Sequence, residues 1–559
     1  MNTTTTVRSR EVVQAGAPVG FDRFFAWWQD ADPVRQKRRV AVFVGGLVLI
    51  CGAAAMIGAV PTKIYGHDVF TGLDSGWRVM HGQRPHIDFD SAWGPVWLLA
   101  VALGLTISRH SVNGIAYANA IVALILGSWS YMLGKRRLAS SPRILFSLFL
   151  AALVAAPYPL GIDFYTYSHA MVYNRYGYAL LGIILLECVA PSRHGSKQEW
   201  IGGISTGAAL SLTLFLKASF FFVGVVLIAA TCIFLSRIGY RRVVGIIAGF
   251  CAISACLLAY LRFNVRAMLN NLRMAAGARA EGITIRNVLR HALAHASVLL
   301  GVVLFALATT LLCGARAPQL RRLRLLMIGA LLFAGDIILM SSNAQTGGLP
   351  LCAIFGILIV NEITEEGQST PASESRLRRP LYAGALFLGA LLFVPQFTGD
   401  VASLACGVWE KWHPPSPEMT SRFTASDLQP LLLYDGQELR SNGNVFTTYV
   451  NDGVALLERE TRPQETIFTM DMTNPFSYAL QRQPAHGGII SPVYYYNLDD
   501  THRPTDDRFF GDADIVMVPL HPSVSAENFR GLLEAYQPGL EQRYYLAARS
   551  QWWRLYRRR

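Results

Sequence analysis

The residues best suited to chemistry lie in one polar stretch, residues 65–95, between two hydrophobic runs. Four carboxylates, Asp68, Asp74, Asp88 and Asp90, stand there among aromatic residues, glycines and prolines. Unpaired polar groups are costly inside lipid, so this stretch is predicted to be a loop at the membrane surface. A carboxylate in such a loop can act as a general base. The alternative is an ordinary solvated loop whose acids cap short helices.

Cations next to hydrophobic runs form a second set of candidates. Lys217 lies between two apolar runs in the sequence FLKASFF, where a charge is costly unless it is paired or faces a ligand. Arg175 lies at the end of a hydrophobic run and could bind a phosphate through two nitrogen donors. The alternatives are that Lys217 snorkels to the membrane interface and that Arg175 anchors an aromatic belt.

The composition indicates a membrane protein. The chain has 559 residues, of which 52% are hydrophobic and 16% charged, whereas a soluble protein carries about a quarter charged residues. Mean hydropathy is +0.32. The net charge of +13 comes largely from basic clusters between the apolar runs. Such clusters follow the positive-inside rule and reflect the orientation of the chain in the membrane, so no nucleic-acid partner is predicted.

Twelve apolar runs can be drawn as membrane spans, and this number creates a conflict. Basic residues predict an inside N-terminus, and the last run leads to an outside domain, which together require an odd number of crossings. The conflict falls on residues 95–133: either 95–108 is a half-span, or the basic loop 134–143 lies outside. The runs are approximately 40–60, 95–108, 114–133, 144–158, 175–190, 201–216, 219–236, 243–261, 296–314, 324–341, 350–362 and 380–397.

Three parts are therefore expected. Residues 1–39 are a cytoplasmic segment, 40–397 a multi-spanning domain whose first outer loop is 61–94, and 398–559 an extracytoplasmic domain. Alternating helical and strand patterns predict an α/β fold for this last part. Its strands are expected at 466–472 and 514–520, its helices at 451–462, 474–481 and 525–536, and a terminal hairpin at 544–556. The predicted fold class is a polytopic helical membrane protein of about 11–13 spans with this C-terminal domain.

Three further outer segments are expected to face the first loop: 158–173, the turn around Lys217, and 262–295. The last is rich in arginines such as Arg266, against the usual bias for the outer side. An anionic ligand would explain these arginines, and a misassigned loop is the other explanation. His169, His86 and Arg78 are secondary site candidates; a lone histidine in an aromatic loop is usually only hydrogen-bonded.

The first loop resembles that of the GT-C class of membrane glycosyltransferases, which includes the aminoarabinose transferases and protein O-mannosyltransferases. The similarity lies in the sequence LDSGWRVMHGQRPHIDFDSAWGP. It contains an acid (Asp74), a short helix, then Gly82, Pro85, Asp88-Phe89 and Gly94-Pro95, with His86 at a position that is aromatic in the family. FLKASFF is similar to a helix-break lysine common in such proteins. The motif covers about thirty residues, whereas the architecture covers the chain.

The resemblance implies a sugar transferase that uses a polyprenyl-phosphate donor. Asp74 would be the base that activates the acceptor, with Asp88 as second candidate and Asp90 less securely aligned. Lys217, Arg175 and Arg266 would bind the donor phosphate. The two aspartates Asp74 and Asp88 could share a divalent cation, Mg²⁺ or Mn²⁺, as in some branches of the family, although no cofactor is certain.

The implied location is a bacterial inner membrane, with the C-terminal domain periplasmic. Membrane lipids surround the chain, and the acceptor on the periplasmic side would be a lipid, a polysaccharide or a protein. Two other functions remain open. A ligase or polymerase of lipid-linked polysaccharide usually has its largest outer loop between late spans, and a transporter or flippase often shows inverted repeats, which this sequence lacks. A family member without activity is a further alternative.

Overall fold

The computed structural model describes residues 33–189, 196–235, 239–278, 284–312, 319–342, 347–369, 372–434, 443–523 and 525–559. The predicted cytoplasmic segment 1–39 therefore lies almost entirely outside the described residues.

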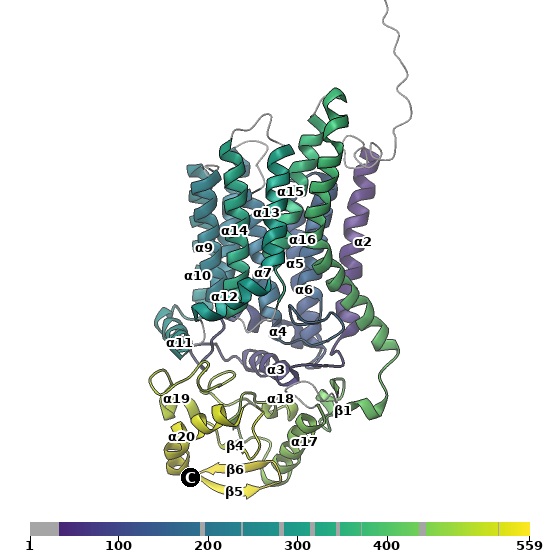
Figure 1. Cartoon of the computed structure of the whole chain (residues 1–559). Helices are drawn as coiled ribbons and strands as arrows, with labels where there is room; N and C mark the ends of the chain where they lie inside the picture. The colour runs from purple at the N-terminus through teal and green to yellow at the C-terminus, as the bar shows by residue number, and fades with distance from the viewer. Residues whose placement is uncertain are drawn as a thin grey trace, which may run out of the picture.

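Long helices form a bundle, and a small C-terminal domain lies at one end of it (Figure 1). We call this the domain end of the bundle and the other the far end; helix α2 begins at the far end. The bundle helices are α2 (Pro33–Ile57), α5 (Gly114–Gly134), α6 (Ser140–Ala155), α7 (Val172–Val189), α8 (Ser196–Leu214), α9 (Ala218–Leu235), α10 (Tyr240–Tyr260), α13 (Ala296–Leu312), α14 (Gln319–Ser342), α15 (Pro350–Ser369) and α16 (Ala372–Trp412).

Among the described residues, five helices are each long and apolar enough to cross a membrane alone. They are Gln36–Ile57, Gly114–Gly134, Tyr240–Tyr260, Arg324–Ser342 and Leu381–Trp412. Helix α12 (Ile285–Ala294) and the start of α13 pass the same test together, bent by 65°. The predicted class, a multi-pass helical membrane protein, is confirmed, while the predicted number of crossings stays a prediction. The expected boundary at 397/398 falls inside α16, which continues to Trp412.

Helix α4 (Pro95–Ile107) is the part of the structure that bears on the conflict over residues 95–133. Its 13 residues span about 20 Å, short of the roughly 30 Å hydrocarbon core. Both of its ends lie at the domain end. Just before it, Gly94 N donates to Leu216 O at 3.1 Å, and just after it, His110 O accepts from the hydroxyl of Tyr478 in the C-terminal domain at 2.6 Å. These contacts favour the half-span alternative for α4, and α5 leads to the basic loop at the far end; the topology of 95–133 stays a prediction.

The C-terminal domain contains a mixed four-stranded sheet in the order β3-β4-β6-β5. Strands β3 (Ile467–Thr469) and β4 (Ile515–Pro519) are parallel and buried, and β6 (Trp553–Arg558) joins antiparallel to β4 and to β5 (Tyr544–Arg549). The predicted strands, hairpin and α/β character are confirmed. The remaining elements are β1 (Thr420–Arg422), β2 (Leu432–Tyr434), α17 (Gly443–Glu460), α18 (Phe476–Ala479), α19 (Asp506–Phe510) and α20 (Ala526–Arg543).

The segments predicted to face the first loop do contact it. Lys63 N donates to Tyr167 O at 2.8 Å, which ties the start of the loop to segment 158–173. Helix α11 (Val265–Ala278) places the Nδ2 of Asn271 2.9 Å from Asp90 Oδ1. The described parts of segment 262–295 therefore lie at the domain end, while the side of the membrane that this end faces stays a prediction.

Candidate functional site

Helix α3 (Gly66–Met80) lies between the bundle and the C-terminal domain, and its two faces are chemically different (Figure 1). Gly72 and Gly76 face α4; a Cβ on Gly76 would lie 2.7 Å from Val101 Cγ1, so only glycine allows this approach. Thr71, Asp74 and Arg78, at helical spacing, line a pocket against the C-terminal domain. The amphipathic pattern of α3 thus directs its polar face toward the domain.

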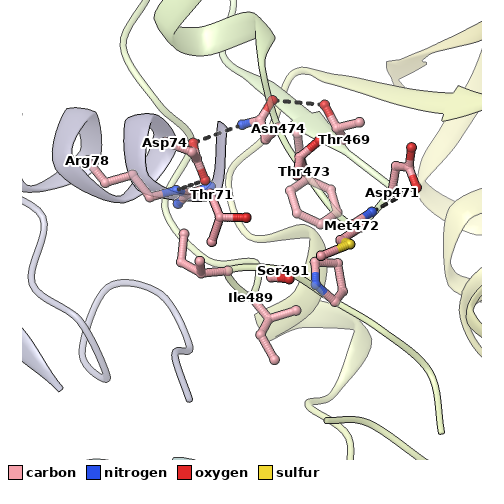
Figure 2. Close-up of a pocket in the computed structure, with 13 residues that line it drawn as sticks. Thr71, Asp74, Arg78, Thr469, Asp471, Met472, Thr473, Asn474, Ile489 and Ser491 are labelled. Carbon is pink, nitrogen blue, oxygen red and sulfur yellow. Dashed lines mark hydrogen bonds and ion pairs between the residues drawn. The ribbon is translucent and has the colours of Figure 1, made fainter. Parts of the chain in front are cut away.

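Asp74 has partners from both sides of this junction (Figure 2). Its Oδ2 accepts from Arg78 Nε at 3.1 Å, and its Oδ1 accepts from the Nδ2 of Asn474 at 3.3 Å. The residue is only 5% exposed. Burial raises the pKa of Asp74 above its ordinary value of 3.8, and the Arg78 guanidinium opposes this without cancelling it. The carboxylate is therefore more basic than one in water.

Arg78 connects α3 to two other segments. Its Nη1 donates to the carbonyl oxygens of Ala485 and Gly487, at 2.8 and 3.1 Å, and to Gln83 Oε1 at 3.2 Å. The guanidinium also lies over the ring of Phe89, 5.2 Å from its centroid. The secondary candidate Arg78 thus positions the Asp74 carboxylate and fixes the C-terminal domain to the first loop.

The other wall of the pocket comes from the segment after β3. Asp471, Thr473 and Asn474 line it, with Ser491 from a second loop of the domain. The hydroxyl oxygens of Thr71 and Thr473 are buried and have no hydrogen-bond partner within the described part of the chain. Sequence reasoning missed these domain residues. The available signal was the sequence DMTN at the end of the predicted buried strand 466–472, but its partner could not be read from the sequence.

Asp471 is held by its own domain. Its Oδ2 accepts from the hydroxyl of Tyr449 and from Ser523 N at 3.0 Å, and its Oδ1 accepts from Met472 N at 2.8 Å. Burial raises its pKa above the ordinary value, and these hydrogen bonds oppose the shift. Asp471 therefore shapes the loop that carries Thr473 and Asn474.

The remaining acids of the first loop have structural partners. Asp88 Oδ2 accepts from Arg84 N at 2.6 Å and closes a turn. Asp90 Oδ1 accepts from Asn271, and from Arg508 Nη2 at 2.9 Å, which joins the loop, α11 and the C-terminal domain. The role of Asp88 as an alternative base stays a prediction, as does that of Asp90.

Both candidate histidines are buried. Burial lowers the pKa of His86, whose Nδ1 lies 2.9 Å from Asn271 Oδ1 and whose Nε2 has no partner among the described residues. Burial also lowers the pKa of His169, whose Nε2 lies 2.9 Å from Gly58 O. Burial therefore favours the neutral form of both rings, and His169 joins segment 158–173 to the end of α2.

Lys217 lies at the break between α8 and α9, beside the start of α4. Its Nζ is 5.1 Å from the ring centroid of Tyr173. The rings of Trp93 and Trp97 lie 5.4 and 5.0 Å from that of Tyr173. The lysine is half-buried. An ammonium held beside aromatic rings at the membrane surface suits the phosphate of a lipid, although this role stays a prediction.

The two predicted arginines lie in different environments. Arg175 is buried; it donates to Leu153 O at 2.7 Å and Tyr158 O at 2.7 and 2.9 Å, and pairs with Asp400 at 3.0 Å. This geometry favours a structural role, and phosphate binding by Arg175 stays a prediction. Arg266 is exposed on α11, so it is accessible to an anion.

The proposed cation also stays a prediction. Asp74 and Asp88 have separate partners, Arg78 with Asn474 for the first and the turn at Arg84 for the second. Within the described ranges, no three His, Cys, Asp or Glu side chains come together in a group that could hold a metal.

Comparison with known proteins gives one kind of match. No model of a protein family and no curated protein matches the sequence. The similar solved structures include ArnT from Cupriavidus metallidurans in the apo state and the same protein bound to undecaprenyl phosphate, at TM-scores of 0.42 and 0.43. Each is 11% identical and covers 92% of this chain and 97% of its own. ArnT is an aminoarabinose transferase of GT-C type, the class that the first loop resembles. This structural similarity does not assign a role to any residue of the chain.

Proposed function

We propose that this chain is a membrane glycosyltransferase that moves a sugar from a polyprenyl-phosphate donor to an acceptor at the domain end. One observation carries the proposal: the carboxylate of Asp74, in the loop with the GT-C-like sequence, is buried in a pocket that the C-terminal domain completes. A buried carboxylate with a raised pKa is typical of a functional group. The acceptor class, a lipid, polysaccharide or protein, is left to experiment.

Asp74 is the general base in this proposal. It takes the proton of an acceptor hydroxyl or amine while the acceptor atom forms a bond to the anomeric carbon of the sugar. The bond from that carbon to the donor oxygen breaks, and polyprenyl phosphate leaves with the electron pair. Arg78 and Asn474 hold the carboxylate in a fixed orientation for this transfer.

Lys217 binds the donor phosphate in this proposal. The aromatic rings around it offer a surface for the lipid chain, and the break between α8 and α9 lies at the membrane surface beside the first loop. The exposed Arg266 on α11 supplies a second cation at the same end. Negative charge on the departing phosphate would be stabilised by such cations.

The domain end is proposed to face the periplasm of a bacterial inner membrane. Support comes from the basic clusters near Arg137 and Arg242, which flank the far-end termini of α5 and α10. Arg137 and Arg242 both pair with the buried Glu187.

Purified protein in lipid vesicles tests the proposal. A panel of polyprenyl-phosphate sugars is offered with a membrane lipid extract, and sugar transfer or release is measured. We expect turnover by the wild type and a loss of about 100-fold or more in Asp74→Asn, because a proton acceptor is removed. Asp163→Asn, an exposed acid in another domain-end loop, is the matched control and should retain full activity.

Stability must be measured beside activity. Asp74→Asn leaves the buried Arg78 without its carboxylate partner, which can cost several kcal/mol. Asp74→Glu keeps the negative charge but moves the carboxylate by one methylene group. Loss of activity in a stable Asp74→Glu protein would therefore come from the displaced carboxylate and not from unfolding. A wild type that folds and turns over no donor would contradict the proposal, and equal activity in Asp74→Asn would remove Asp74 as the base.

A further inference from the structure

We propose that the pocket between α3 and the C-terminal domain binds a hydroxyl-bearing ligand through Thr71 and Thr473. The pocket takes one hydroxyl of a sugar or of an acceptor group and holds it beside the Asp74 carboxylate. This inference deepens the proposed function and rests on it. It adds the C-terminal domain as a part of the substrate site.

The threonine hydroxyls provide the main argument. Thr71 is 6% exposed and Thr473 2%, and both oxygens are buried without a hydrogen-bond partner in the described chain. Leaving a buried hydroxyl unpaired is costly, so most buried polar groups have a partner. Both residues line the same pocket as Asp74, one from α3 and one from the segment after β3 (Figure 2). A ligand hydroxyl in this pocket can donate to one of them and accept from the other.

The pocket's size and polarity limit the ligand. The free space inside it is about that of one water molecule, far below that of a typical small-molecule site. It therefore admits a single hydroxyl group at the edge of a larger substrate. Asp74, Asn474 and Ser491 add polar atoms to the wall. An apolar lipid chain would leave the Thr71 and Thr473 hydroxyls unsatisfied, so the bound portion is polar.

Asn474 determines how the two walls are joined. Its Nδ2 donates to Asp74 Oδ1 at 3.3 Å, and its Oδ1 accepts from Thr469 Oγ1 at 2.8 Å. The amide is thereby oriented by the end of β3. Asn474 is a positioning residue: it places the carboxylate relative to the ligand hydroxyl.

Isosteric variants of the full-length protein in nanodiscs test this inference. Thr71→Val and Thr473→Val remove only the hydroxyl. Thr447→Val is the matched control, because Thr447 is also a buried threonine without a partner among the described residues but lies outside the pocket. Thermal midpoints should be unchanged or higher in all three, since a buried unpaired hydroxyl becomes a methyl group.

Two measurements separate the sources of the hydroxyl. The first is the ratio of the Kd values for undecaprenyl phosphate and for undecaprenyl phosphate bearing each sugar of the panel. If the pocket holds the donor sugar, this ratio falls about 3- to 10-fold in Thr71→Val and Thr473→Val. A change of this size corresponds to the loss of one hydrogen bond. The second is the KM for the membrane lipid extract. If the pocket holds the acceptor, this KM rises by a similar factor while the donor ratio is unchanged.

The outcomes are distinguishable from failure of the proposed function. Suppose that the wild type binds undecaprenyl phosphate, and that the Kd ratio and the KM of Thr71→Val and Thr473→Val equal those of Thr447→Val. This result would overturn the present inference alone, because the two hydroxyls would then bind only water. A wild type that binds no undecaprenyl phosphate would remove the proposed function and this inference with it.

Discussion

At the scale of single residues, the pKa of Asp74 is shifted by burial and, in the opposite direction, by two hydrogen-bonding neighbours. Burial raises its pKa, and the Arg78 guanidinium opposes this from four residues along the same helix. The i,i+4 spacing places both side chains on one face of α3. Asn474 then fixes the second oxygen from the C-terminal domain. The proton affinity of the candidate base is therefore raised by burial and lowered by one contact within the helix and one across the junction.

The pH dependence of sugar transfer should reflect the ion pair between Asp74 and Arg78. Only the deprotonated carboxylate can accept a proton, so activity should fall as pH decreases through the pKa of Asp74, above the ordinary 3.8. In Arg78→Met the opposing charge is lost and the pKa rises further. We expect the acidic limb of kcat/KM to move up by about 1–3 pH units.

Arg78→Lys retains a positive charge and should keep the acidic limb near its wild-type position. Circular dichroism and melting of each variant check that the fold is retained. An acidic limb that does not move in a folded Arg78→Met protein would contradict the assignment of Asp74 as the base.

At the scale of secondary-structure elements, the Gly94-Pro95 pair explains how the first loop meets the membrane bundle. Pro95 suits the first position of α4, where the missing N–H has no helical partner. Gly94 allows backbone contact with the break that precedes Lys217: its N donates to Leu216 O, and Val96 N donates to Phe215 O, each at 3.1 Å. The aromatic residues of the same segment then surround Lys217.

Gly94→Ala should push the start of α4 away from the break between α8 and α9. A Cβ there would lie 2.0 Å from Phe215 O and 2.8 Å from Phe215 Cα, atoms of a backbone that cannot rotate away. We expect a loss of about 1–3 kcal/mol in stability and weaker binding of undecaprenyl phosphate. Gly384→Ala is the control, because no atom lies within 4 Å of its added Cβ. Equal melting temperatures for the two variants would refute the close contact.

At the scale of the whole molecule, different contacts hold the two ends of the helix bundle together. At the far end, the buried Glu187 pairs with Arg137 and Arg242 and links α7 to α10 and to the loop after α5. At the domain end, the C-terminal domain contacts the first loop, where Arg508 pairs with Asp90 and Asn474 donates to Asp74. The domain therefore contacts the site directly as well as through the loop that carries Asp74.

Arg508→Met should loosen the C-terminal domain. Arg508 donates to Asp90 Oδ1, to Ile87 O at 2.6 Å and to His86 O at 3.3 Å, so three contacts are lost together. Amide hydrogen exchange in 86–91 and 487–490 should become roughly tenfold faster or more, because hydrogen bonds to charged groups are lost. Arg543→Met, which removes a pairing with the exposed Asp507 of the same domain, should leave these rates unchanged.

The sequence by itself determined the class of the molecule and the location of its chemistry. Apolar runs are long enough to identify a membrane bundle, because lipid requires continuous apolar surface. The strand at 514–520 was visible as a continuous apolar run, and the first loop as a concentration of acids. The pairing of Asp74 with Arg78 also lies within reach of sequence, since residues four apart share a helix face.

Only the tertiary structure decided what these residues face. Whether residues 95–107 cross the membrane depends on contacts at both ends of α4, which lie with Leu216 and Tyr478, more than one hundred residues away. The polar sequence after β3 gave no sign that Asn474 would reach Asp74, 400 positions along the chain. Local propensities report on neighbours in sequence. The buried pocket, the occupied donors of Arg175 and the junction at Asp90 arise from long-range packing, which those propensities do not encode.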